Sequence, residues 1–239
     1  MPLGRRPHPA PDRDRSWIRD EKTFQKVFAA LPEPVNYVFW LGNRSGLRPS
    51  ETRALRMQDF AIVDEGLIVV RGSAADDGIG PLKEDWRGHG KAKMVPAHAD
   101  TEKVIGPWLK RRRAEGAGPE DLVFVPAKPG DRPRACGWQG IRKEFVQSCW
   151  EAARIVCGLQ DMTFYEATRH SFISRNLEAG VPLDEVSAAV NHSSPLVTKE
   201  THYPRFVRRF FSDLIRGVRR LGRTERVRRR GRGAGGRRG

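Results

Sequence analysis

The chain has 239 residues, of which 38% are hydrophobic and 31% are charged, and it carries a formal net charge of +15. This length suits one sizeable domain with tails, large enough to bury a core. The sequence contains no apolar run of about 18 residues and no signal-peptide pattern, so it argues against a membrane protein and favours an intracellular one.

The positive charge is concentrated at the C-terminal end. Residues 205–239 contain fourteen arginines and two acidic residues, a net charge of +12 that leaves +3 for the rest of the chain. Residues 217–239 are rich in arginine and glycine and cannot build a core, so we expect a disordered basic tail there. Such a tail either screens phosphate groups nonspecifically or is simply solvated. Residues 1–16 are expected to be disordered as well, and residues 17–216 to form the folded domain.

Apolar periodicity predicts a mostly helical body. In chain order, helices are expected around residues 24–31, from 35 towards 48, from Pro49, at 101–114, at 139–156, from about 169 to a stop at Gly180, and from 183 to 190. Three short strands are expected at 61–63, 67–70 and 93–95, with a turn at 64–66. The predicted fold class is therefore mainly α with a small antiparallel β-sheet.

Two separate blocks of residues indicate a chemistry. The upstream block is Ser45-Gly46-Leu47-Arg48-Pro49-Ser50-Glu51, and the downstream block is Thr168-Arg169-His170-Ser171-Phe172, followed by Asn191-His192-Ser193-Ser194 and by Tyr203. Proline suits the first position of a helix, which would place Arg48 at the helix N-terminus and Glu51 in the first turn. Two guanidiniums and an imidazole can hold the charge that develops when a phenol oxygen attacks a phosphodiester, without a metal ion.

Together, these blocks resemble the catalytic domain of tyrosine recombinases, the phage integrase family, over roughly residues 17–206. The resemblance implies that Arg48 and Arg169 are the catalytic arginines, that Glu51 is a supporting acid, that His192 is the catalytic histidine and that Tyr203 is the nucleophile. The resemblance also implies the fold of that catalytic domain and double-stranded DNA as the partner. It implies no cofactor and no metal, and a cytoplasmic, nucleoid-associated location. A homotetramer on a DNA synapse remains open.

Three tyrosines compete for the role of nucleophile. Tyr37 lies in an apolar segment that indicates core, and Tyr165 is too close in sequence to Arg169 to swing freely. Tyr203 is the remaining candidate, although it could instead be a packing residue. His192, likewise, could be an ordinary histidine at the C-terminal end of a helix.

The resemblance also implies that the general acid is a lysine in a β-hairpin turn, to be sought between residues 82 and 96. Lys91 is our choice because it precedes the predicted strand at residues 93–95 by the length of a turn. Lys83 is the alternative, and either lysine could be an ordinary surface charge.

The sequence departs from the family pattern at Glu166, where a histidine is usual three residues before Arg169. We expect Glu166 to support Arg169 or Arg48 through an ion pair. His192 and Tyr203 are also separated by one or two residues more than is usual. The predicted function is a site-specific DNA recombinase or integrase that acts through a 3′-phosphotyrosine intermediate. The alternative is a catalytically impaired DNA-binding protein that retains the fold, and a monomeric topoisomerase is a third option.

Overall fold

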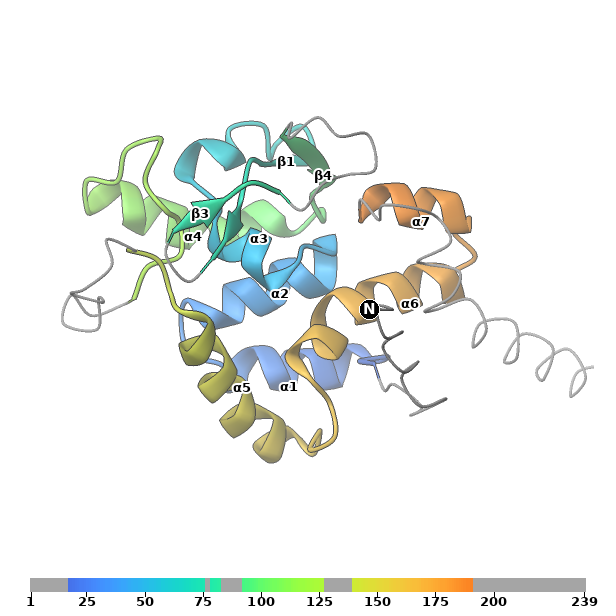
Figure 1. Ribbon diagram of the computed structural model, residues 1–239. Helices are drawn as coiled ribbons and strands as arrows, with labels where there is room; N and C mark the ends of the chain where they lie inside the picture. Colours follow the sequence, from blue (N-terminus) through green and yellow to red (C-terminus); the bar gives the residue numbers. More distant parts are fainter. Residues whose placement is uncertain (1–16, 76–77, 83–91, 127–138, 191–239) are drawn as a thin grey trace, which may run out of the picture.

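The computed structural model describes residues 17–75, 78–82, 92–126 and 139–190 (Figure 1). Its helices are α1 (Glu21–Ala30), α2 (Val35–Ser45), α3 (Pro49–Arg53), the 3-10 helix η1 (Met57–Phe60), α4 (Thr101–Ala114), α5 (Lys143–Cys157), the π-helical turn η3 (Glu166–His170), α6 (Ser171–Glu178) and α7 (Leu183–Ala189). Its strands are β1 (Leu67–Val70), β2 (Ser73–Ala74), β3 (Ile79–Gly80) and β4 (Lys93–Pro96). This arrangement confirms the predicted fold class.

Helix α2 lies at the centre of the domain, with α1 and α5 on one side and α3 with the strands on the other (Figure 1). Every residue of α2 except Arg44 is buried. A helix that is covered on all sides must be surrounded by other elements, and α2 packs against α1, α3, α4, η3 and α6. The two sequence blocks singled out above therefore meet at α2, because one follows this helix directly and the other lies on η3 and α6.

Strands β1 and β4 pair antiparallel, with Val70 opposite Lys93 and Ile68 opposite Val95. Strands β2 and β3 form a second antiparallel pair. Side chains alternate between the two faces of a strand, so Lys93 lies on the same face of β4 as Val95, which is buried. The sheet thus directs a lysine towards the interior.

A smaller apolar cluster joins α6 to α7. Its buried members are Ile173, Leu177, Val186 and Val190. Gly180 follows α6 with a φ of 86°, a left-handed conformation that glycine adopts without steric cost, and the helix ends there as the sequence predicts.

Two expected elements differ from the structure. The segment 61–63 is not a strand, because the N–H groups of Ala61 and Val63 bond back to the carbonyls of Gln58 and Phe60 in successive turns. The helix expected from residue 139 begins at Lys143 instead, since Ile141 is pinned by a hydrogen bond from its N–H to the Phe124 carbonyl. The helix expected at 101–114 and the strand expected at 67–70 are confirmed with their bounds.

Gly42 marks the closest approach of α2 to the turn that carries Arg169. A Cβ atom at Gly42 would lie 2.7 Å from the Cβ of Thr168, which is itself fully buried. We therefore expect Gly42→Ala to lower the free energy of unfolding by about 1–3 kcal/mol through overpacking, despite the better helix propensity of alanine. Denaturant unfolding followed by circular dichroism measures this change.

Gly106 provides a matched control inside α4. Beyond its chain neighbours, a Cβ atom there would meet nothing closer than 3.9 Å, the distance to Cγ of Glu102. Pro107 follows directly, and a proline crowds the Cβ of a helical residue before it, so this steric cost offsets the gain in helix propensity of up to about 1 kcal/mol. Gly106→Ala should therefore change the free energy of unfolding less than Gly42→Ala does. Equal changes from both substitutions would show that the contact between α2 and η3 yields easily.

Candidate active site

Arg48 lies at the N-cap of α3, directly ahead of Pro49 at the first helical position, as the sequence predicts. Its backbone N–H donates to Oε2 of Glu51 at 2.9 Å, and its Nη1 donates to Oε1 of the same carboxylate at 2.8 Å. Glu51 is 4% exposed, whereas the Arg48 side chain is 28% exposed. The buried carboxylate therefore fixes the arginine at two points and leaves part of its side chain open to solvent.

A second cation binds the same carboxylate oxygen. Lys93, on β4, donates from Nζ to Oε1 of Glu51 at 2.8 Å, and its side chain is only 10% exposed. Lys93 is not one of the two lysines, Lys91 and Lys83, that the sequence led us to expect. The alternation of side chains along β4 could have found it, because a lysine on the same face as a buried valine needs an acidic partner in the interior.

Arg169 lies in η3 and is fully buried. Its Nη1 donates to the carbonyl of Gly46 at 2.9 Å, and its Nη2 donates to the carbonyl of Val190. Its Nε has no hydrogen-bond acceptor among the described residues. Arg169 thus ties the end of α2 to the end of α7 and keeps one buried donor unused.

The charges of these groups influence one another. Burial opposes ionisation of Glu51, but the charges of Lys93 and Arg48 outweigh it and lower the pKa of this carboxyl. Burial lowers the pKa of Lys93 to about 8, although Glu51 favours the ammonium form. Burial, reinforced by the charge of Arg48, lowers the pKa of Arg169 to about 10. Three cationic side chains therefore surround one ionised carboxylate, which leaves an excess of positive charge.

Glu166 does not form the expected ion pair. Its Oε2 accepts hydrogen bonds from the backbone N–H and the hydroxyl of Thr163, each at 2.8 Å. The expected partnership with Arg48 or Arg169 is wrong in this structure, because the carboxylate caps the start of its own helical turn. This local geometry was open to any acidic residue three positions after a threonine.

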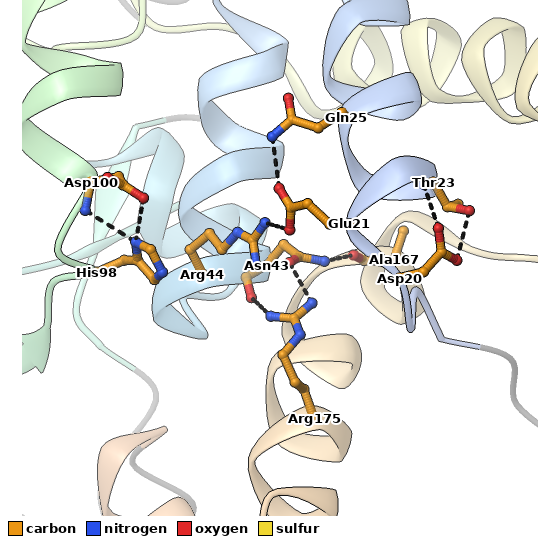
Figure 2. Close-up of polar contacts among 10 residues, drawn as sticks. All are labelled: Asp20, Glu21, Thr23, Gln25, Asn43, Arg44, His98, Asp100, Ala167 and Arg175. Atoms are coloured by element: carbon orange, nitrogen blue, oxygen red, sulfur yellow. Dashed lines mark hydrogen bonds and ion pairs between the residues drawn. The ribbon is translucent and has the colours of Figure 1, made fainter.

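Asn43 holds the Arg169 turn against α2 (Figure 2). Its side chain is fully buried, and its Nδ2 donates to the carbonyl of Ala167 at 2.7 Å. Arg175 of α6 donates to the Asn43 carbonyl at 3.2 Å and to its Oδ1 at 2.8 Å. Neither residue was predicted from the sequence, although an asparagine within the largely apolar α2 was a signal for a buried polar contact.

The neighbouring Arg44 is the one residue of α2 that is partly exposed, and Figure 2 shows it beside Glu21. It forms an ion pair with Glu21 of α1, and its guanidinium carbon lies 3.8 Å from the ring centroid of Phe24. Both contacts fasten the C-terminal end of α2, just ahead of the segment that carries Arg48.

The structure brings together three of the predicted site residues, Arg48, Glu51 and Arg169. Four others, His192, Tyr203, Lys91 and Lys83, lie outside the described residues. Of the tyrosines that compete with Tyr203, Tyr37 is a core residue, as predicted, and its hydroxyl donates to Glu33 Oε1 at 2.6 Å. The other, Tyr165, is 38% exposed.

The described residues contain neither a candidate membrane span nor a candidate metal site. No helix among them is both long and apolar enough to cross a membrane. No group of three or more histidine, cysteine, aspartate or glutamate side chains among them is placed to hold a metal ion.

A mainly helical domain with a small antiparallel sheet and this arrangement of arginines has the fold of a tyrosine recombinase catalytic domain. Residues 24–205 match the model of the phage integrase family, and the chain belongs to this family. It is 30% identical to a protein of Sinorhizobium fredii (strain NBRC 101917 / NGR234) named as an integrase/recombinase, y4rB. That similarity covers 46% of this chain and 35% of the relative, so the chain matches about a third of its relative's length.

Solved structures share the fold at low sequence identity. The XerA recombinase gives a TM-score of 0.61 at 17% identity, over 87% of this chain and 66% of that one. The Tn1549 transposon integrase in complex with transposon right end DNA gives 0.58 at 13% identity, over 81% and 63%. The XerH site-specific recombinase bound to palindromic difH substrate gives 0.53 at 17% identity, over 76% and 48%.

The buried ammonium of Lys93 makes a testable contribution to stability. Because its folded pKa of about 8 lies below the reference value of 10.5, the unfolded chain binds more protons between these values. The free energy of unfolding should therefore rise with pH in this window by up to about 1.4 kcal/mol per pH unit, the limit for one proton. Below pH 8, both states are protonated and the contribution is constant.

Comparison with Lys93→Met isolates this effect. The difference in the free energy of unfolding between the parent and Lys93→Met should shift in favour of the parent from pH 8 to pH 10, measured by urea denaturation. Lys103→Met, at an exposed position of α4, is the matched control and should show no such trend. A flat difference for Lys93→Met would contradict the lowered pKa of Lys93 in the folded state.

Proposed function

We propose that this protein is a site-specific DNA recombinase or integrase that cleaves and rejoins DNA strands through a 3′-phosphotyrosine intermediate. The observation that carries the proposal is the cluster of Arg48, Arg169 and Lys93 around the single carboxylate of Glu51. An excess of positive charge on preorganised, partly buried donors suits a phosphate group whose charge increases during reaction. Membership of the phage integrase family supports the same chemistry.

In the proposed reaction, the phenol oxygen of Tyr203 attacks phosphorus and loses its proton, while the bond from phosphorus to the 5′-oxygen breaks. A lysine, Lys91 or Lys83, gives a proton to the leaving oxygen. Arg48, Arg169 and His192 hold the negative charge on the non-bridging oxygens, and each such donor is worth about 2.7–4 kcal/mol in a preorganised site. Attack by a neighbouring 5′-hydroxyl on the phosphotyrosine reverses the step and reseals the strand.

The described donors fit these roles to different degrees. The Arg48 side chain is partly exposed, so it can meet a phosphate that arrives from solvent. Arg169 is buried, but its unused Nε donor needs an acceptor, and a buried donor without one costs roughly 1–3 kcal/mol. These cationic side chains supply charge stabilisation of the kind that metal ions give in other phosphoryl transfers, so we expect the reaction to need no metal ion and no nucleotide cofactor.

The proposed partner is double-stranded DNA. The similar XerH and Tn1549 proteins were solved in complex with DNA. The net charge of +12 within residues 205–239 favours binding to a polyanion, whatever its sequence. Assembly of four protomers on a synapse and a place in the cytoplasm at the nucleoid belong to the same proposal.

Glu166 favours a second candidate function, a DNA-binding protein that retains the recombinase fold but has lost catalytic power. A carboxylate stands where the family usually has a histidine, so one donor to the phosphate is missing. DNA binding without strand cleavage is the behaviour that separates this candidate from the first.

Tyr203 should become covalently linked to a DNA 3′-phosphate. A nicked duplex that loses its 5′-hydroxyl fragment after cleavage traps this intermediate, which then survives denaturing electrophoresis. Tyr203→Phe should abolish the adduct and preserve DNA binding, whereas Tyr37→Phe, at a core position, should leave the adduct in place. An equal amount of covalent adduct from Tyr203→Phe would overturn the assignment. DNA binding without any adduct in the parent would support the impaired DNA-binding protein.

The general acid can be found with a 5′-bridging phosphorothioate, because a thiolate leaving group needs no proton. Lys91→Ala should cleave ordinary DNA poorly and the phosphorothioate at nearly the parent rate. The same rescue in Lys83→Ala, rather than in Lys91→Ala, would move the role to Lys83. Rescue in neither variant would exclude both lysines as the general acid.

A further inference from the structure

We propose that Lys93 is a positioning residue, which fixes the Glu51 carboxylate and, through it, the orientation of the Arg48 guanidinium. This inference rests on the proposed function, since it assigns Lys93 a part in preparing the site for phosphate. It is distinct from proton donation by Lys91 or Lys83.

The hydrogen bonds define this role. Oε1 of Glu51 accepts from Nζ of Lys93 and from Nη1 of Arg48, each at 2.8 Å, while Oε2 accepts from the Arg48 backbone N–H at 2.9 Å. Both carboxylate oxygens are therefore engaged, and the oxygen that holds the arginine fork is the one that Lys93 holds. The position of Oε1 therefore sets where the Nη1 end of the Arg48 guanidinium lies.

The position of Lys93 is itself rigid. It stands opposite Val70 in the pairing of β4 with β1, and Val70 is fully buried in the main core. A residue held by a strand ladder keeps its Cα fixed, whereas a lysine on a free loop does not. The sheet therefore delivers the ammonium group to a carboxylate that lies on a separate element, α3.

Charge supports the same role. Without Lys93, a buried carboxylate and Arg48 would form a simple ion pair, in which the arginine charge is largely offset. With Lys93 present, the carboxylate is shared between two cations, and Arg48 keeps more of its charge for an incoming phosphate. Loss of Lys93 should therefore weaken the stabilisation of the transition state by Arg48, whatever the leaving group is.

The experiment compares the single-turnover cleavage rates of the full chain on two nicked duplexes, one ordinary and one with a 5′-bridging phosphorothioate. Lys93→Met should slow both reactions by a similar factor, on the order of 10- to 100-fold, as small displacements of a catalytic group do. Lys93→Arg, which can still donate to Glu51, should recover most of the rate. Lys103→Met is the matched control at an exposed lysine and should cleave like the parent.

A double substitution tests whether Lys93 acts through Glu51. If it does, the loss in Glu51→Gln/Lys93→Met should be close to the larger of the two single losses. Losses that multiply would overturn the proposal, as would parent-like cleavage of both substrates by Lys93→Met. Selective rescue of Lys93→Met by the phosphorothioate would also overturn it and make Lys93 the general acid.

A measurement without DNA separates this proposal from the proposed function and from simple misfolding. Nitrogen-15 NMR of the Arg48 guanidinium should show resolved, slowly rotating Nη groups in the parent and averaged ones in Lys93→Met, at equal near-ultraviolet circular dichroism. If the parent cleaves neither substrate, the proposed function fails, and this comparison still decides the role of Lys93. Identical Arg48 signals in parent and variant would overturn the positioning role.

Discussion

The candidate site depends on one buried carboxylate. Arg48, Lys93 and Arg169 lie close enough to affect one another's ionisation, and like charges in a poorly solvated place repel strongly. Glu51 makes the cluster tenable by accepting hydrogen bonds from two of the three. A buried charge that loses its partner is expensive, so the removal of Glu51 would disturb the cations more than the removal of any one cation would disturb Glu51.

The frame around that carboxylate is built from the C-terminal end of α2. Gly46 ends this helix with a φ of 70°, and its carbonyl accepts from Arg169, while Arg48 follows two residues later. The positions of both arginines therefore depend on the same short backbone segment at the end of α2. The second carbonyl that Arg169 holds belongs to Val190, two residues before His192 in the sequence. The arginine therefore fixes the point from which the chain continues towards the predicted histidine and tyrosine.

Much of this arrangement could be predicted from the sequence. Local sequence signals were enough where a structure forms within one helix, as for Arg48 ahead of Pro49 or for the helix at 101–114. They failed for 61–63, where apolar residues suggested a strand but turn hydrogen bonds satisfied the backbone first. They also missed Asn43 and Lys93, because the partner of each lies far away in the sequence, 124 residues from Asn43 and 42 from Lys93. A polar residue in an apolar segment indicates that a hydrogen-bonding partner exists, but the sequence does not identify that partner.

The contacts of Glu166 change what its departure from the family pattern implies. A carboxylate beside the scissile phosphate would oppose the charge that builds during reaction, and such a repulsion would argue for a decayed enzyme. In the structure, the Glu166 carboxylate is engaged by Thr163, at the start of its own turn. Its charge is therefore directed at a backbone N–H and a hydroxyl and does not neutralise Arg48 or Arg169. The case for an impaired protein then rests on the missing histidine donor, a loss of one interaction, and no longer on an added repulsion.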